Sequence, residues 1–165
     1  MGVSERPIIF SAPMVRAILA GRKTMTRRLA TSPLRKCEPG DMLWVRESFK
    51  LADSGMDPRG EHLIYNADGA HGYAVSSSRF VKVKMKSISS IHMPRWASRI
   101  TLEVTGARVE RLQDISEEDV AAEGVDPYCM TARGAFFALW NSLHGPASWE
   151  ANPSVVCVSF KRIPR

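Results

Sequence analysis

Segments of strand length outnumber helical segments along this chain and lie on both sides of them. Short apolar or alternating runs predict strands at 7–10, 42–49, 80–86, 99–105 and 154–163, an extended segment at 24–28, and a weaker hairpin at 63–65 and 73–75. Helical spacing, capping residues and terminating glycines predict helices between Ser11 and Gly21, over 117–123 and over 131–143. This order favours an α+β, mainly β fold in which helices pack on the flank of a small β-barrel.

The length and composition fit a single soluble domain. The 165 residues are 44% hydrophobic and 24% charged, as in ordinary globular proteins. We therefore expect one domain over 1–165, with an elaboration of the core at about 51–78, where Gly, Asp, His and Asn interrupt the pattern. The longest apolar runs, such as 155–158, are too short to cross a bilayer, and the first residues lack the plan of a signal peptide.

The cysteines and histidines carry no metal or disulfide pattern. Cys37, Cys129 and Cys157 are odd in number and far apart, which favours a reducing cytoplasm over a disulfide framework or a zinc site. The four histidines show no metal-ligand spacing. We expect a cytoplasmic protein that uses neither a metal nor another cofactor.

Positive charge is concentrated at the start of the chain. The formal net charge is +6, and residues 6–37 hold eight Lys or Arg and no acid, whereas residues 101–126 hold eight acids. A second acid-free stretch contains the cations between Arg79 and Arg99. Such clustering suits an anionic partner, most simply a nucleotide or a nucleic acid. The alternative is an ordinary solvated basic face.

The run from Gly21 to Arg28 contains the side chains best suited to chemistry. Lys23 and Thr26 lie three positions apart among Arg22, Arg27 and Arg28. Repulsion between cations, aided by burial, favours a neutral Lys23, and a neutral amine can take the proton of a neighbouring hydroxyl. The alternatives are a solvated lysine and a threonine chosen only for its strand propensity.

Three motifs together resemble those of the ASCH domain family, whose fold is a PUA-like β-barrel. They are 20–28 after the first helix, the Gly-Asp turn with its strand at 39–45, and the acidic segment 115–124. Small bacterial ASCH proteins hydrolyse N4-acetylcytidine and related N4-acylcytidines with a lysine, a threonine three positions later and a glutamate on the later helix. By this resemblance Lys23, Thr26 and Glu123 are catalytic. Glu123 would otherwise be an ordinary glutamate in the last turn of a helix.

The resemblance leaves two mechanisms open for amide hydrolysis. In the first, Lys23 activates Thr26 as nucleophile, and Glu123 protonates the leaving nitrogen or orients the amide. In the second, Lys23 and Glu123 activate a water and Thr26 only binds substrate.

Further residues are candidates for substrate binding because they are cationic, hydroxylated or aromatic and lie near these motifs. A pyrimidine can stack on an indole, and loops commonly carry binding residues. Trp44 could equally be a core residue and Trp96 a packing residue, whereas the spacing of Phe136, Phe137 and Trp140 favours a core role. The candidates are Arg22, Thr24, Arg28, Trp44, Glu47, Arg95 and Trp96.

Three functions compete at this point. The first is an amidohydrolase acting on a small-molecule acylated nucleoside. The second is a non-catalytic RNA-binding module of the PUA-like kind that grips RNA through its basic patches, and the third is a ribonuclease that uses Lys23 and the arginines. We expect no membrane partner, and a monomer or a small homo-oligomer.

Overall fold

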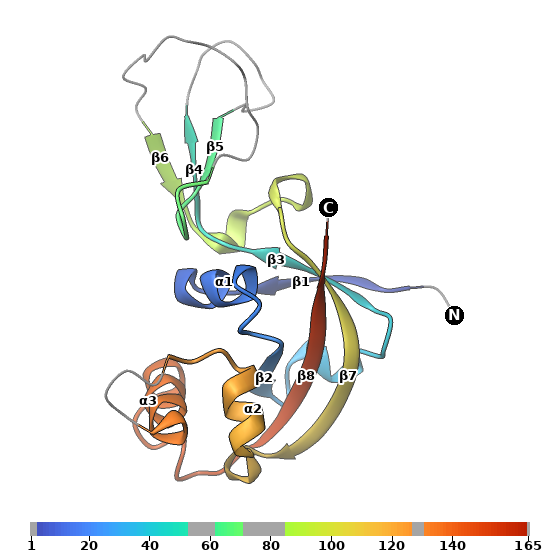
Figure 1. Ribbon diagram of the computed structural model, residues 1–165, viewed down its shortest axis with the longest axis vertical. Coiled ribbons are helices and arrows are strands. Elements are labelled where there is room, and N and C mark those ends of the chain that lie inside the picture. The colour runs from blue at the N-terminus through green and yellow to red at the C-terminus, as the bar shows by residue number, and fades with distance from the viewer. Residues whose placement is uncertain (1–2, 53–61, 71–84, 127–130, 165) are drawn as a thin grey trace.

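The computed structural model describes residues 3–52, 62–70, 85–126 and 131–164, arranged as two β-sheets and three α-helices (Figure 1). The larger sheet has the strand order β1-β3-β7-β8-β2, in which β1 and β3 are parallel and the other neighbours antiparallel. Its strands are β1 (Glu5–Ile9), β2 (Met25–Leu29), β3 (Met42–Arg46), β7 (Thr101–Arg111) and β8 (Ser154–Ile163). The smaller sheet has the order β5-β4-β6 and comprises β4 (Phe49–Ala52), β5 (His62–Tyr65) and β6 (Met85–Ile88).

The helices begin and end close to where their capping residues predict. They are α1 (Ala12–Leu19), α2 (Glu117–Ala122) and α3 (Ala132–His144). Ser116 caps α2 by accepting a hydrogen bond from the Asp119 N–H, and Thr131 caps α3 in the same way. Gly21 and Gly124 follow α1 and α2 with φ of 73° and 70°, a conformation that favours glycine. Short 3₁₀ helices occupy Pro33–Lys36, Ser90–His92, Arg95–Ala97 and Leu112–Asp114.

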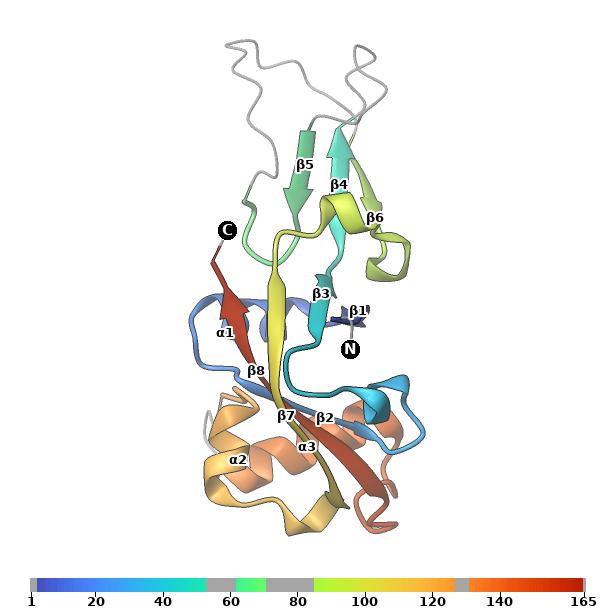
Figure 2. The same cartoon turned by 90° about the vertical axis from the view of Figure 1, so that its right-hand side faces the viewer.

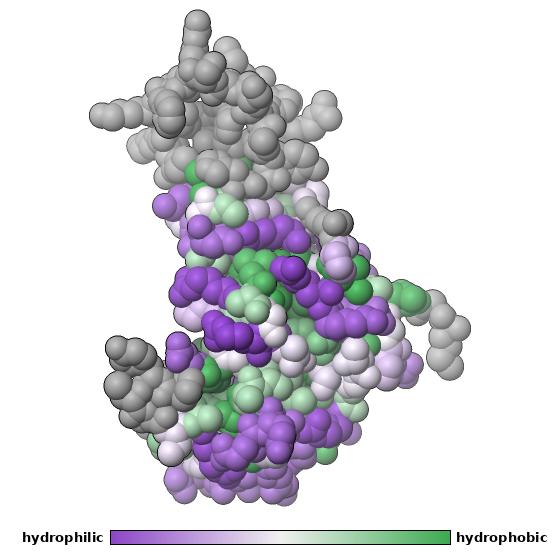
Figure 3. Space-filling model, in the orientation of Figure 1, coloured by the Kyte–Doolittle hydropathy of each residue, from purple (hydrophilic) through white to green (hydrophobic). Residues whose placement is uncertain are grey.

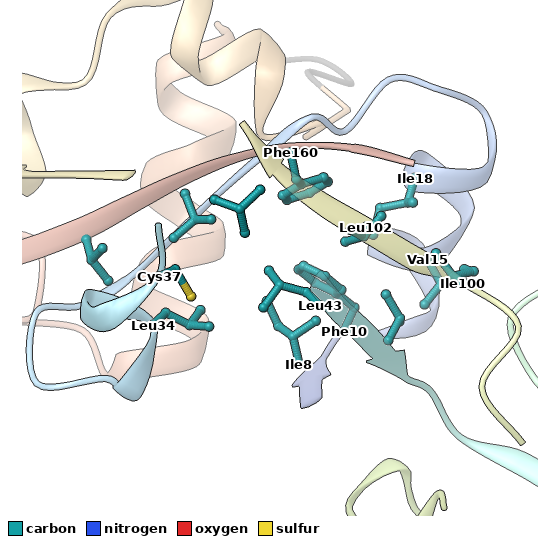
Figure 4. Close-up of a cluster of buried hydrophobic side chains, with 14 of the residues drawn as sticks. Ile8, Phe10, Val15, Ile18, Leu34, Cys37, Leu43, Ile100, Leu102 and Phe160 are labelled. Carbon is teal, nitrogen blue, oxygen red and sulfur yellow. The ribbon is translucent and has the colours of Figure 1, made fainter. Parts of the chain in front are cut away.

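The main hydrophobic core lies between α1 and one face of the larger sheet. In Figure 4 the side chains of Ile8 on β1 and of Phe10 just after it lie close to Leu43 on β3, and Phe160 of β8 belongs to the same cluster. Val15 and Ile18 of α1 contribute from the helix side. A second cluster joins α2 and α3 to β8 around Leu112, Val120, Phe136, Trp140 and Trp149. Burial of these two faces fixes the helices on the sheet.

Several strand predictions need correction. The segment 42–49 is two strands, because the chain leaves the larger sheet after Arg46 and enters the smaller one at Phe49. The segment 99–105 is the start of a longer strand, β7, which has a register irregularity between Val104 and Gly106. The segments 73–75 and 80–84 lie outside the described residues, whereas β5 confirms the predicted strand at 63–65.

The predicted barrel is not confirmed. The strand order of the larger sheet leaves β1 and β2 at its two edges, and no ladder joins them among the described strands. The architecture is mixed α and β, with the helices packed on the sheet as expected.

The smaller sheet and the pair of helices α2 and α3 lie at opposite ends of the molecule (Figure 2). Hydrophilic side chains dominate the face seen in Figure 3, and smaller hydrophobic areas lie among them. Among the described residues, we find no helix with the length and apolar character that a membrane crossing requires.

Candidate functional site

A pocket of about 330 Å³ lies where the β1–α1 junction, β2, the end of α2 and one face of α3 meet. Its volume is at the lower end of the range for small-molecule sites. Lys23, Thr26 and Glu123 all line it, so the structure brings together the three residues assigned to catalysis by the resemblance. The full lining is Ile9, Phe10, Ser11, Met14, Lys23, Thr26, Arg27, Arg28, Ser48, Ser90, Glu123, Phe136, Leu139, Trp140, Leu143 and His144.

Lys23 is buried and uses all three of its ammonium hydrogens. Its Nζ donates to the Met25 carbonyl at 2.8 Å, to the Glu123 carbonyl at 2.9 Å and to Glu123 Oε2 at 2.8 Å. The side chain is 2% exposed. Burial lowers the pKa of Lys23, while the charge and hydrogen bond of Glu123 oppose that decrease. This lysine is therefore not a solvated surface cation.

Glu123 is held between two cations. Its Oε2 binds Lys23, and its Oε1 accepts a longer contact of 3.5 Å from Arg27 Nη1. The side chain is 5% exposed, so both oxygens are taken out of water and matched by donors. The arrangement places a proton acceptor directly on the Lys23 ammonium.

Arg27, which contacts Glu123 of this pair, was not among the predicted site residues. Its fully buried guanidinium also binds Glu110 at 2.7 Å and Asp119, and Arg108 binds the same two acids. Two cations therefore share the acidic groups of β7 and α2. The opposite charges of the basic segment 6–37 and the acidic segment 101–126 are the sequence signal that could have indicated such pairing.

Backbone contacts set the position of Lys23. The N–H groups of Arg22 and Lys23 both donate to the Ala17 carbonyl at the end of α1, and the Thr24 N–H donates to the Ala122 carbonyl of α2. A Cβ on Gly124 would lie 2.7 Å from Lys23 Cβ. Only glycine permits the end of α2 to approach this closely, and that approach brings Glu123 to Lys23.

Thr26 lies on β2 opposite Val158 of β8 and its side chain reaches the same pocket. The residue is only 3% exposed. Its hydroxyl forms no hydrogen bond with any residue that the structure describes. The hydroxyl is therefore free to contact a ligand in the pocket.

Arg28 reaches across the sheet edges. Its Nη2 donates to the Ile9 carbonyl of β1 at 2.6 Å, and its guanidinium carbon lies 5.5 Å from the centre of the Phe10 ring. The Lys23 ammonium lies at the same distance from that ring. Burial lowers the pKa of Arg28, which still leaves an arginine charged at neutral pH.

One face of α3 supplies the apolar wall of the pocket, which was not predicted. Phe136 and Trp140 are buried as expected, but they also line the pocket with Leu139, Leu143 and His144. His144 stacks on Trp140 with ring centres 4.1 Å apart, and burial and nearby Arg28 lower its pKa. Phe137 is 39% exposed and packs edge-on against Trp149, so its predicted core role is wrong.

The other candidate binding residues lie outside this pocket. Arg22 and Thr24 flank Lys23 but are exposed. Trp44 is buried on the face of β3 away from the core. The guanidinium carbons of Arg46 and Arg95 lie 4.7 and 5.8 Å from the centre of its ring.

Glu47, Arg95 and Trp96 also lie elsewhere. Glu47 is buried and forms a bidentate ion pair with Arg99. Burial raises the pKa of Glu47 and Arg99 opposes this. Arg95 binds Glu5 at the surface, and Trp96 is 55% exposed in the neighbouring loop. None of these three lines the pocket.

Metal-binding groups are not found in the described part of the chain. No cluster of three or more His, Cys, Asp or Glu side chains there could hold a metal ion. Cys37 and Cys157 are buried free thiols, and Cys129 lies outside the described residues. Burial raises the pKa of Cys157 to about 12, so it is not a reactive thiolate.

The fold is that of an ASCH domain, as the sequence motifs indicated. Two solved structures show this likeness. The ASCH domain from Lactobacillus crispatus JV V101 is 13% identical, with a TM-score of 0.53, over 96% of this chain and 79% of that chain. The hypothetical protein PH0355 is also 13% identical, with a TM-score of 0.51, over 96% of this chain and 99% of that chain. No family model matches the sequence, and no curated protein matches it.

Proposed function

We propose that this protein belongs to the ASCH family and is an amidohydrolase that cleaves the N4-acyl amide of N4-acetylcytidine or a related N4-acylated cytosine nucleoside. The observation that carries the proposal is the buried Lys23–Glu123 pair, which lies beside the unbonded Thr26 hydroxyl in one pocket. Amide hydrolysis needs a nucleophile, a base that activates it and a proton donor for the leaving nitrogen.

The reaction begins with a proton transfer inside the pair. Lys23 passes one proton to Glu123 Oε2, which leaves a neutral amine and a neutral carboxylic acid. The lowered pKa of Lys23 and its 2.8 Å contact with Glu123 support this step. The Lys23 amine then removes the Thr26 proton as Oγ1 attacks the acyl carbon.

The leaving group departs with that same proton. As the C–N bond breaks, Lys23 returns the proton to N4, cytidine leaves, and the acyl group stays on Thr26 as an ester. Lys23 then takes a proton from a water as that water attacks the ester, and it passes this proton to Thr26 Oγ1 as the carboxylic acid leaves. Glu123 finally returns its proton to Lys23, which restores the starting ion pair. In the alternative mechanism this water attacks the amide directly and Thr26 binds the substrate.

The RNA-binding alternative has less support because much of the basic run is neutralised internally. Lys23 and Arg27 are buried in ion pairs, and Arg95 and Arg99 of the second basic stretch bind Glu5 and Glu47. These cations are not free to contact a phosphate backbone. The same pairing weakens the ribonuclease alternative.

The test is release of cytidine from N4-acetylcytidine by the purified protein. We expect Lys23→Met and Thr26→Val to lower kcat/KM by at least about a hundredfold, since each removes a group in direct contact with the reaction. Thr26→Ser should retain much of the activity if Oγ1 is the nucleophile. Lys161→Met and Thr105→Val are matched controls, because both residues are exposed and neither lines the pocket.

Two results would contradict the proposal. The first is absence of turnover by the folded wild-type protein with any N4-acylcytidine. The second is full activity of Lys23→Met. Retention of activity by Thr26→Val with a raised KM would instead assign the attack to water.

A further inference from the structure

A second hollow adjoins the pocket along the gap between the two edge strands of the larger sheet. It measures about 420 Å³ and is lined by β1, by Arg28 of β2 and by the start of the 3₁₀ helix at Pro33–Lys36. Ile9 and Arg28 line both cavities. The hydrogen bond from Arg28 to the Ile9 carbonyl therefore marks the boundary between two compartments of one groove.

Two arginines line this second hollow, and neither forms an ion pair within the described residues. The Arg28 side chain donates to a backbone carbonyl. The Arg6 side chain makes no hydrogen bond among the described residues, and its Nε is buried without a partner. By contrast, Arg27, Arg95, Arg99 and Arg108 all bind carboxylates. Unpaired guanidinium groups in a concave site are typical of anion recognition.

The surroundings favour an anion further. No Asp or Glu lines the hollow, and the remaining lining is Pro7, Ile8, Ile9, Ser32, Pro33 and Leu34. The pKa of Asp41 is lowered first by hydrogen bonds from the N–H groups of Glu38 and Ser4 and only least by the charge of Arg6, with which Asp41 forms no ion pair. The Ser32 hydroxyl accepts a 3.3 Å contact from the Leu34 N–H and keeps its own hydrogen free to donate.

We infer that this hollow binds the phosphate of a nucleotide whose base occupies the adjoining pocket, with Arg6 as the residue that selects a nucleotide over a nucleoside. This inference rests on the proposed function, because it takes a cytosine base as the occupant of the pocket. Because Ile9 and Arg28 line both compartments, the phosphate site that we infer adjoins the base site. The substrate class is then an N4-acylated cytidine carrying a phosphate ester.

The experiment measures binding by isothermal titration calorimetry with the full chain at low ionic strength. The probes are cytidine, cytidine 3′-monophosphate, cytidine 5′-monophosphate and inorganic phosphate. We expect one monophosphate to bind about tenfold more tightly than cytidine, as a charge-assisted contact gives. This advantage should disappear in Arg6→Gln, return in part in Arg6→Lys and shrink with added salt. Arg162→Gln, at an exposed arginine outside both cavities, should keep it.

The outcomes separate this inference from the proposed function. Equal affinity for cytidine and both monophosphates overturns the inference, and so does a full advantage in Arg6→Gln. Inorganic phosphate that binds as tightly as the nucleotides overturns it as well, since base and phosphate would then bind independently. Arg6-dependent nucleotide binding without any amide hydrolysis would support the inference and reject the amidohydrolase. Hydrolysis of N4-acetylcytidine with a kcat/KM that a phosphate ester on the substrate does not raise would support the amidohydrolase and reject the inference.

Discussion

Replacing Glu123 with glutamine removes one negative charge from the centre of the buried cluster while keeping the shape of the side chain. Lys23 loses its carboxylate at 2.8 Å but keeps two carbonyl acceptors, and Arg27 loses the 3.5 Å contact but keeps Glu110 and Asp119. Breaking a buried ion pair costs about 3–5 kcal/mol, and these remaining partners reduce the expected loss to about 2–3 kcal/mol. For a domain of this size, the melting temperature should fall by roughly 5–10 °C.

The loss should also depend on pH. Burial lowers the pKa of Lys23 below its ordinary 10.5, and Glu123 opposes this, so Glu123→Gln lowers the Lys23 pKa further. Between the folded pKa and 10.5 the unfolded chain binds more protons than the folded one, and the free energy of unfolding therefore rises with pH. Because the folded pKa of Lys23 is lower in the variant, the free energy of unfolding begins to rise at a lower pH there than in the wild type. The difference from wild type should be largest near neutral pH and shrink as the pH increases.

Urea denaturation followed by tryptophan fluorescence, at a series of pH values, measures this effect. Glu118→Gln is the control, since Glu118 is exposed on the same helix and its replacement should change the free energy of unfolding by less than about 0.5 kcal/mol. The reasoning is refuted if Glu123→Gln behaves like Glu118→Gln. It is also refuted if the difference from wild type grows with pH.

Three other predictions follow from particular contacts. Gly124→Ala should lower the free energy of unfolding by about 1–3 kcal/mol, because alanine must adopt a φ of 70° and its Cβ would meet Lys23 Cβ at 2.7 Å. A denaturant titration that gives the stability of the wild type would contradict this. Arg99→Met should leave Glu47 buried without its cation and lower the melting temperature by several degrees, with unchanged melting as the contrary result. Cys157 should resist iodoacetamide at pH 8 in the folded protein and react once urea unfolds it, because burial raises its pKa to about 12; peptide mass spectrometry distinguishes this from rapid native labelling.

The local elements were predictable because their signals lie within a few neighbouring residues. Ser116 and Gly124 delimit α2, and the continuous apolar run 155–158 marks the first half of β8. The resemblance to the ASCH family also indicated Lys23, Thr26 and Glu123, which line the pocket together. Capping residues and apolar runs record the local backbone preference and the buried face of a segment, which each segment expresses by itself.

The tertiary structure alone decided which partners these residues meet. Arg27 pairs with Glu110, Asp119 and Glu123, α3 turns an apolar face into the pocket, and Glu47 binds Arg99. The two edge strands leave a groove between them that Arg6 and Arg28 line. These contacts join segments up to about a hundred residues apart, and their geometry depends on strand order and helix packing, which no local pattern of residues encodes.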